Sequence, residues 1–88
     1  MYQLPLFKES KAFIDSLTIK LTPELLLKLY ALYQQGSKGD NKAKEPKDNA
    51  FKSTKDKYAA WEKLKGITFV DAQLDYIYLA RKIKDGNL

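Results

Sequence analysis

Hydrophobic and polar positions follow one another along the chain with a period that predicts four helices and one long loop. Apolar side chains recur every three or four residues, which is the spacing of one face of an α-helix. The second helix is the clearest, because Thr22 is a suitable N-cap and Pro23 and Glu24 suit the first helical turn. Its C-terminus is expected at Gly36 or at Gly39. The four predicted helices cover residues 4–17, 22–36 (or 22–39), 51–65 and 68–84.

A polar segment, residues 36–50, separates the second and third predicted helices and shows no helical period. A connection of this length without secondary structure is uncommon in a compact domain and is often functional, although a plain solvated connection is the alternative. Gly66 is expected to cap the third helix, and Thr68 with Asp71 opens the fourth as a shortened capping box. The tail, residues 85–88, is expected to fray. Short connections on either side of one long loop predict a compact bundle.

The length of 88 residues predicts a single domain, residues 1–88, with one modest core. Hydrophobic residues make up 44% of the chain and charged residues 31%, which is typical of a folded globule. No apolar run is long enough to span a bilayer, and the N-terminus does not resemble a signal peptide. The absence of cysteine fits a reducing compartment, so we expect a cytoplasmic protein.

The residue types that are missing limit the chemistry. With no histidine and no cysteine, the usual general base, the thiolate nucleophile and the common zinc ligands are absent. The eleven acidic residues are scattered among lysines, which is typical of solvated helix faces. We therefore expect no enzyme, no catalytic residue, no metal site and no cofactor. The net charge of +5 favours an anionic partner, and nucleic acid, an anionic membrane and a phosphorylated small molecule all satisfy it.

Aromatic and basic side chains recur together in the last three predicted helices. Tyr30 and Tyr33 are three residues apart on one helix, Lys57 and Trp61 are a similar pair on the next, and Tyr76 is on the last. A phosphorylated nucleotide needs what these side chains offer: rings that stack on the base, hydroxyls that bond phosphate oxygens, and ammonium groups that neutralise charge. Aromatic residues at helical spacing are more often core residues, however, and that interpretation is the stronger one for Trp61.

Two stretches of this chain resemble the acyl-CoA-binding proteins. Residues 29–40 resemble the second-helix signature of that family, in which two tyrosines three apart precede lysine, glutamine, small residues and glycine. Residues 57–72 resemble the later signature Lys-Trp-x-Ala-Trp-x-x-Leu-Lys-Gly-x-Ser-x-Glu-Asp-Ala, and Tyr76 with Ile77 falls where the family has Tyr-Ile. The two motifs stand in the expected order, and the resemblance covers nearly the whole chain.

The resemblance implies an all-α fold, a four-helix up-down-down-up bundle with a long loop between helices 2 and 3. It also implies a monomeric intracellular carrier and pool former that binds one long-chain fatty acyl-CoA with high affinity. Tyr30 and Tyr33 would bind the 3′-phosphate and stack on adenine, Lys57 would pair with the phosphate, and Tyr76 would contact the ligand. The acyl chain would lie in an apolar groove, for which the plausible walls are Leu26, Leu27 and Leu29.

The chain departs from the family pattern at several basic positions. The family's lysine after the second tyrosine is Gln34 here, which remains a candidate ligand residue, and Lys38 on the same helix is a possible source of the missing charge. A basic residue that the family often carries in the first helix falls on Asp15, so no ligand role is expected there. Another family lysine matches either Lys52 or Lys55, because one extra residue precedes Lys57; we favour Lys52.

Three other functions compete with this interpretation. A basic helical nucleic-acid-binding domain is disfavoured, because the lysines are spread over several helices and mixed with acidic residues. A protein-interaction module that docks through the long loop is the second alternative, and an enzyme acting on acyl-CoA is the third. We expect no nucleic-acid partner and at most transient contact with membranes or with enzymes that use acyl-CoA.

Overall fold

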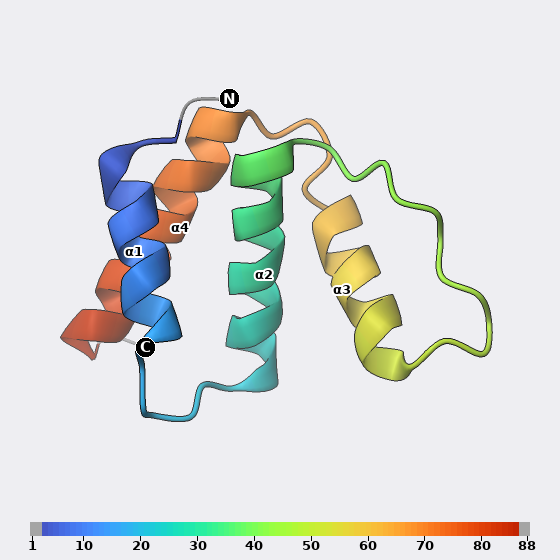
Figure 1. The fold of residues 1–88 in the computed structure, drawn as a ribbon, viewed down its shortest axis with the longest axis horizontal. Coiled ribbons are helices and arrows are strands. Elements are labelled where there is room, and N and C mark those ends of the chain that lie inside the picture. The colour runs from blue at the N-terminus through green and yellow to red at the C-terminus, as the bar shows by residue number, and fades with distance from the viewer. Residues whose placement is uncertain (1–2, 87–88) are drawn as a thin grey trace.

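The computed structural model describes residues 3–86, which form four α-helices and contain no strand. Figure 1 shows that α1 and α4 run in one direction and that α2 and α3 run in the other, so the predicted up-down-down-up order is confirmed. Because α2 and α3 are parallel, the chain between them must return along the whole length of α3 (Figure 1). The helices are α1 (Pro5–Asp15), α2 (Pro23–Lys38), α3 (Lys52–Glu62) and α4 (Phe69–Asp85).

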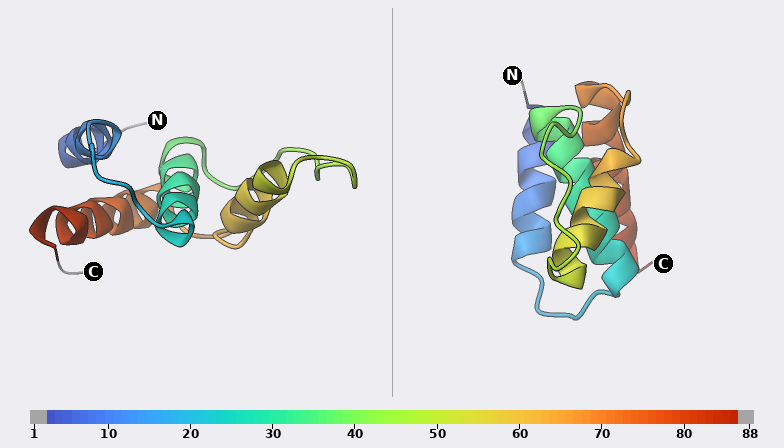
Figure 2. Two further views of the ribbon diagram at one scale, coloured as in Figure 1. Left: turned by 90° about the horizontal axis from the view of Figure 1, so that it is seen from below. Right: turned by 90° about the vertical axis from the view of Figure 1, so that its right-hand side faces the viewer.

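The second and fourth helices together form the centre of the packing. The fourth helix contacts both α1 and α2, whereas α3 packs on α2. Figure 2 accordingly shows α2 between the pair formed by α1 and α4 on one side and α3 on the other. The core cluster draws on α1, α2 and α4, and its buried members are Phe7, Leu29, Leu32, Tyr76, Leu79 and Ile83. The third helix contributes Trp61 as its one buried residue and is otherwise an outer element.

Most helix boundaries follow the local signals in the sequence. The Oγ1 of Thr22 accepts a hydrogen bond from the N–H of Leu25 at 3.2 Å, and that of Thr68 accepts from the N–H of Asp71 at 3.1 Å. Of the two predicted ends of α2, Gly39 is the correct one; its φ of 82° is a conformation that side chains rarely adopt. The predicted fourth helix is one residue short, since α4 includes residue 85; the last two residues of the predicted frayed tail lie outside the described residues.

The third helix ends three residues earlier than predicted and begins one residue later, at Lys52. It ends at Glu62, and residues 63–66 form turns that finish at Gly66, where φ is 93°. The long connection therefore comprises residues 39–51, beginning three residues later than predicted. Asn41 attaches this connection to α3, because its side chain donates a hydrogen bond to the carbonyl of Tyr58 at 3.5 Å and accepts one from the N–H of Ala43 at 2.9 Å.

Gly36 lies inside α2, at a point where side chains of α1 and α4 approach the helix closely. A Cβ atom at this position would stand 3.0 Å from Cγ of Gln73 and 3.1 Å from Cζ of Phe7. Neither neighbour moves easily: Phe7 is fully buried, and the side chain of Gln73 donates to the Gly36 carbonyl at 2.9 Å and accepts from the N–H of Leu4 at 2.9 Å. A glycine at this position therefore reflects packing rather than a helix end.

Gly36→Ala is expected to lower the free energy of unfolding by about 1–2 kcal/mol, because overpacking outweighs the gain in helix propensity. Urea denaturation of the two proteins measures the difference. Ala12→Gly, at an exposed position of α1, calibrates the propensity term separately. An increase in stability equal to the full propensity term would show that Phe7 and Gln73 move aside at no cost, and that Gly36 is not required by packing.

Candidate functional site

Tyr30, Gln34 and Lys57 lie together where α2 faces α3. The Lys57 Nζ is 5.4 Å from the centroid of the Tyr30 ring, which is within the range of a cation–π contact. One helical turn after Tyr30, the Nε2 of Gln34 donates a hydrogen bond to the Tyr30 hydroxyl at 3.3 Å. The structure thus brings together three of the residues singled out from the sequence. The group combines an ammonium, a hydroxyl and an amide, all of which bind phosphate oxygens.

The long connection forms one wall of a small hollow beside this group. The hollow has a volume of about 220 Å³, and Tyr30, Lys44, Lys57 and Trp61 are among its lining residues. Lys44 adds a second ammonium that sequence reasoning did not single out, since nothing in a polar loop reveals which helix it folds back upon. Lys38 lies elsewhere. It is two helical turns beyond Tyr30 and lines a separate hollow at the start of α4.

Tyr33 and Tyr76 belong to an aromatic cluster with Phe7. The rings of Phe7 and Tyr33 are stacked at a centroid distance of 5.4 Å, and Phe7 meets Tyr76 edge-on at 5.3 Å. Burial raises the pKa of Tyr76, and the negative charge of Asp15 and the neighbouring Tyr33 raise it further. Its hydroxyl therefore stays protonated and is able to donate a hydrogen bond. Tyr33 is half-buried, so both the core and the ligand interpretations retain a physical basis.

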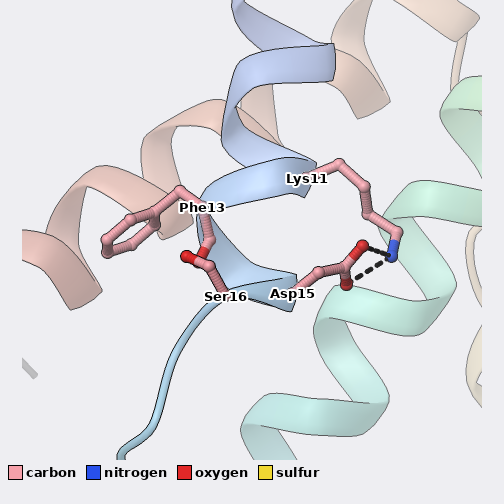
Figure 3. Close-up of polar contacts among 4 residues, drawn as sticks. All are labelled: Lys11, Phe13, Asp15 and Ser16. Carbon is pink, nitrogen blue, oxygen red and sulfur yellow. Dashed lines mark hydrogen bonds and ion pairs between the residues drawn. The ribbon is translucent and has the colours of Figure 1, made fainter.

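Lys11 and Asp15 of α1 form an ion pair that lies over this cluster. The Lys11 Nζ is 2.6 and 2.8 Å from the two carboxylate oxygens of Asp15 and 4.9 Å from the centroid of the Tyr33 ring. Figure 3 shows both side chains extending from α1 toward α2, whereas Phe13 points to the other side of α1. Sequence reasoning did not single out Lys11. Its spacing of four residues from Asp15 predicts the pair, but not the contact with Tyr33.

The two candidate lysines at the start of α3 have different partners. Lys52 forms an ion pair with Asp56 at 2.9 Å, and its side chain is 87% exposed. Lys55 donates a hydrogen bond to the carbonyl of Asp48 and so helps to hold the long connection against α3. This arrangement leaves Lys52 the more available of the two for a ligand, and its role in binding stays a prediction.

The three leucines expected to form a groove point in different directions, because successive residues of a helix are about 100° apart. Leu26 is 52% exposed and lies one turn before Tyr30. Leu27 lines a largely apolar groove between α2, α3 and α4, with a volume of about 620 Å³. Leu29 is only 4% exposed and packs in the core. The three side chains therefore do not form one wall, and Leu29 has little surface left for a ligand.

Trp61 fixes the position of α3 against the end of α2. Its indole Nε1 donates hydrogen bonds to the Oε1 of Gln35 at 3.1 Å and to the carbonyl of Gly39 at 2.9 Å. Gln35 is fully buried and was not anticipated from the sequence. The structural interpretation of Trp61 is therefore supported, since buried polar groups are stable only when they are hydrogen-bonded. By locating α3, this contact also sets the distance between Lys57 and Tyr30.

Asp40 extends the same network to the turn before α4. Its Oδ1 accepts hydrogen bonds from the N–H of Gly66 at 2.8 Å and from the Nε2 of Gln35 at 2.9 Å. These two bonds lower the pKa of the Asp40 carboxyl. Gln35 also donates to the carbonyl of Ile67 at 2.8 Å. A single buried amide thus connects α2, the long connection and the entry to α4.

Residues 3–86 contain neither a membrane-spanning helix nor a metal-binding group. None of the helices there is long and apolar enough to cross a bilayer. The same residues hold no group of three or more acidic side chains arranged to bind a metal ion.

Comparisons with known proteins identify sequence relatives and a solved structure with a similar fold. A family model described as acyl-CoA-binding protein matches residues 5–80. The acyl-CoA-binding protein of Saccharomyces cerevisiae is 39% identical over 80 residues, which cover 89% of this chain and 88% of the relative. That of Dictyostelium discoideum is 36% identical over 77 residues, covering 88% and 90%. The crystal structure of Oryza sativa acyl-CoA-binding protein 2 has the same fold, with a TM-score of 0.86, 24% identity and coverage of 93% and 90%.

Proposed function

The chain belongs to the acyl-CoA-binding protein family, and from this premise we propose that it binds long-chain fatty acyl-CoA esters with high affinity. The family consists of binding proteins rather than enzymes. The observation that carries the proposal is the position of Lys57 over the Tyr30 ring, 5.4 Å from its centroid, with the exposed Leu26 one turn away. A phosphate-binding group thus adjoins apolar surface, which is what an amphiphilic nucleotide ester requires.

The nucleotide would bind between α1, α2 and α3. Lys57 neutralises phosphate charge, the Tyr30 hydroxyl bonds a phosphate oxygen, and the Gln34 amide provides a neutral donor beside it. Tyr33 presents a ring to the adenine, but Phe7 already stacks on that ring and Lys11 also contacts it. Stacking of adenine on Tyr33 therefore requires Lys11 to move aside. Tyr76 is only 1% exposed, so it acts from within the core by packing near Tyr33. Lys52 is the proposed outer cation.

The acyl chain would cover apolar side chains of α2. Leu26 offers exposed surface beside Tyr30, and Leu27 opens onto the groove that α3 and α4 complete. Burial of the chain and its thioester keeps a detergent-like molecule out of micelles and away from water. We further propose that residues 1–88 act as one monomeric cytoplasmic domain. It would hold a pool of ligand and exchange it through transient contact with membranes or acyl-CoA-using enzymes.

Calorimetric titration with palmitoyl-CoA, free CoA and free palmitate tests the proposal. Palmitoyl-CoA is expected to bind more tightly than either of its parts, because each part satisfies only half of the site. Equal binding of palmitate and palmitoyl-CoA would contradict a nucleotide site. Failure to bind palmitoyl-CoA, together with tight oligonucleotide binding that weakens steeply with salt, would favour a nucleic-acid-binding domain instead.

A further inference from the structure

The Lys11–Asp15 ion pair differs from an ordinary surface pair in what lies beneath it. The pair of Lys52 and Asp56 has the same order and spacing, but its lysine is 87% exposed. The Lys11 side chain is only 33% exposed and lies over the Tyr33 ring, toward α2 (Figure 3). A lysine four residues before an acid is the less favourable orientation within a helix, so the pair adds little to helix stability. Its position over the site therefore calls for another explanation.

We propose that Lys11 is a phosphate-binding residue of the acyl-CoA site that pairs with Asp15 when the site is empty. On this proposal, which rests on the proposed function, the Lys11 ammonium leaves the Asp15 carboxylate and pairs with a phosphate oxygen of the nucleotide when ligand binds. Asp15 is the internal competitor for that ammonium. The first helix thus supplies a cation from one turn before the position at which the family usually carries one.

Three features of the site support this exchange. The pair faces the cluster of Phe7, Tyr33 and Tyr76, on the side of α1 that adjoins the other proposed nucleotide contacts. Burial is the main cause of the raised pKa of Tyr76, and the negative charge of Asp15 raises it further. A phosphate placed near these rings would likewise be repelled by Asp15 unless a cation compensated. The movement of Lys11 that frees its ammonium would also uncover Tyr33 for adenine. One rearrangement of the Lys11 side chain would therefore supply a cation to the phosphate and expose the Tyr33 ring to adenine.

Titration of palmitoyl-CoA into single-site variants tests the proposal. Lys11→Gln is expected to weaken binding roughly tenfold, the loss typical of one partly exposed charge-assisted contact. Asp15→Asn is expected to tighten binding severalfold, because the ammonium no longer has an internal partner, and to make the affinity fall more steeply with salt. Lys57→Gln provides the reference for loss of a phosphate contact, and Lys11→Arg, which keeps the charge, should retain most of the affinity.

The matched control is Lys84→Gln. Lys84 also lies near an aromatic ring, 6.0 Å from that of Phe13, and Figure 3 shows that Phe13 points away from the Lys11–Asp15 pair. The substitution removes the same charge outside the proposed site, so it should leave the affinity unchanged apart from a small general salt effect. With palmitoyl-pantetheine, which lacks the nucleotide, Lys11→Gln and the original protein should bind equally.

The outcomes separate this inference from the proposed function. If the original protein does not bind palmitoyl-CoA, the function itself is wrong. If it binds, but Lys11→Gln behaves like Lys84→Gln, only the role of Lys11 is overturned. The role is also overturned if Asp15→Asn weakens binding as much as Lys11→Gln, because the ion pair would then be a structural unit. Melting temperatures of the ligand-free variants are expected to differ little, since both side chains lie at the surface.

Discussion

Phe7→Ala will lower the free energy of unfolding by about 3–5 kcal/mol, the cost typical of truncating a fully buried aromatic side chain. Phe7 has 0% exposure and packs against both the Tyr33 and the Tyr76 rings. Its removal leaves a cavity where α1, α2 and α4 meet. Because domains of this kind have a total stability of roughly 5–15 kcal/mol, the variant should reach its unfolding midpoint at a much lower urea concentration than the original protein. Urea denaturation followed by circular dichroism measures the difference.

Leu6→Ala is the matched control for this truncation. Leu6 is adjacent in α1 but 52% exposed, so its loss should cost less than about 1 kcal/mol. The remaining folded Phe7→Ala protein should also bind palmitoyl-CoA more weakly, because Tyr33 loses the ring on which it stacks. Equal stability of the Phe7→Ala and Leu6→Ala variants would show that α1 is not packed as described.

Lengthening the acyl chain of the ligand by four carbons is expected to strengthen binding by up to ~3 kcal/mol, since each buried methylene contributes ~0.8 kcal/mol. This corresponds to about two decades in the dissociation constant. Ordering of the chain and incomplete burial reduce the gain, and affinity should level off once the apolar surface is covered. A calorimetric series from octanoyl-CoA to palmitoyl-CoA measures the trend. Equal affinity for these two esters would contradict an acyl-binding groove.

Two variants locate the surface that reads chain length. Leu26→Asn should flatten the dependence of affinity on length, because Leu26 offers exposed apolar surface next to Tyr30. Ile19→Asn is the control: Ile19 is 60% exposed but lies in the connection between α1 and α2. If affinity depends on chain length in the same way for Leu26→Asn and Ile19→Asn, the acyl chain does not lie on Leu26. The groove at Leu27 would then be the next candidate.

The elements that were predicted correctly depend on local signals. Thr22 and Thr68 precede the first turns of α2 and α4, and their hydroxyls accept hydrogen bonds from N–H groups only three residues further along the chain. Such short-range caps can be predicted from the sequence. The errors occur where tertiary packing decides. Gly36 resembles a helix end, yet its lack of a side chain is what lets Phe7 and Gln73 approach α2. The early end of α3 is tied to Gly66, whose N–H bonds Asp40, 26 residues away in the sequence.

In the candidate site, too, contacts within one helix were predictable from the sequence, whereas contacts between helices were not. Residue types suggested grouping Tyr30 with Lys57, and the family resemblance implied that both bind one ligand. Spacing could not show that they meet, because the two residues are on different helices. The contact between Lys11 and Tyr33 was missed for that reason: no pattern within α1 indicates what it faces on α2. By contrast, helical geometry alone predicts that Leu26 and Leu27 point in different directions, so they could line the same groove only as separate walls.

The central position of α4 has a consequence for protein synthesis. This helix is the last of the four to be made, and it supplies half of the buried core cluster and the partner of both α1 and α2. While the ribosome extends the chain, at about 5–20 residues per second, α1 and α2 emerge with apolar faces that nothing yet covers. Folding to the native bundle therefore follows translation of α4. A premature stop codon before residue 76 would remove all three core-cluster residues that α4 supplies, so the product is expected to stay unfolded and to be recognised by chaperones and proteases.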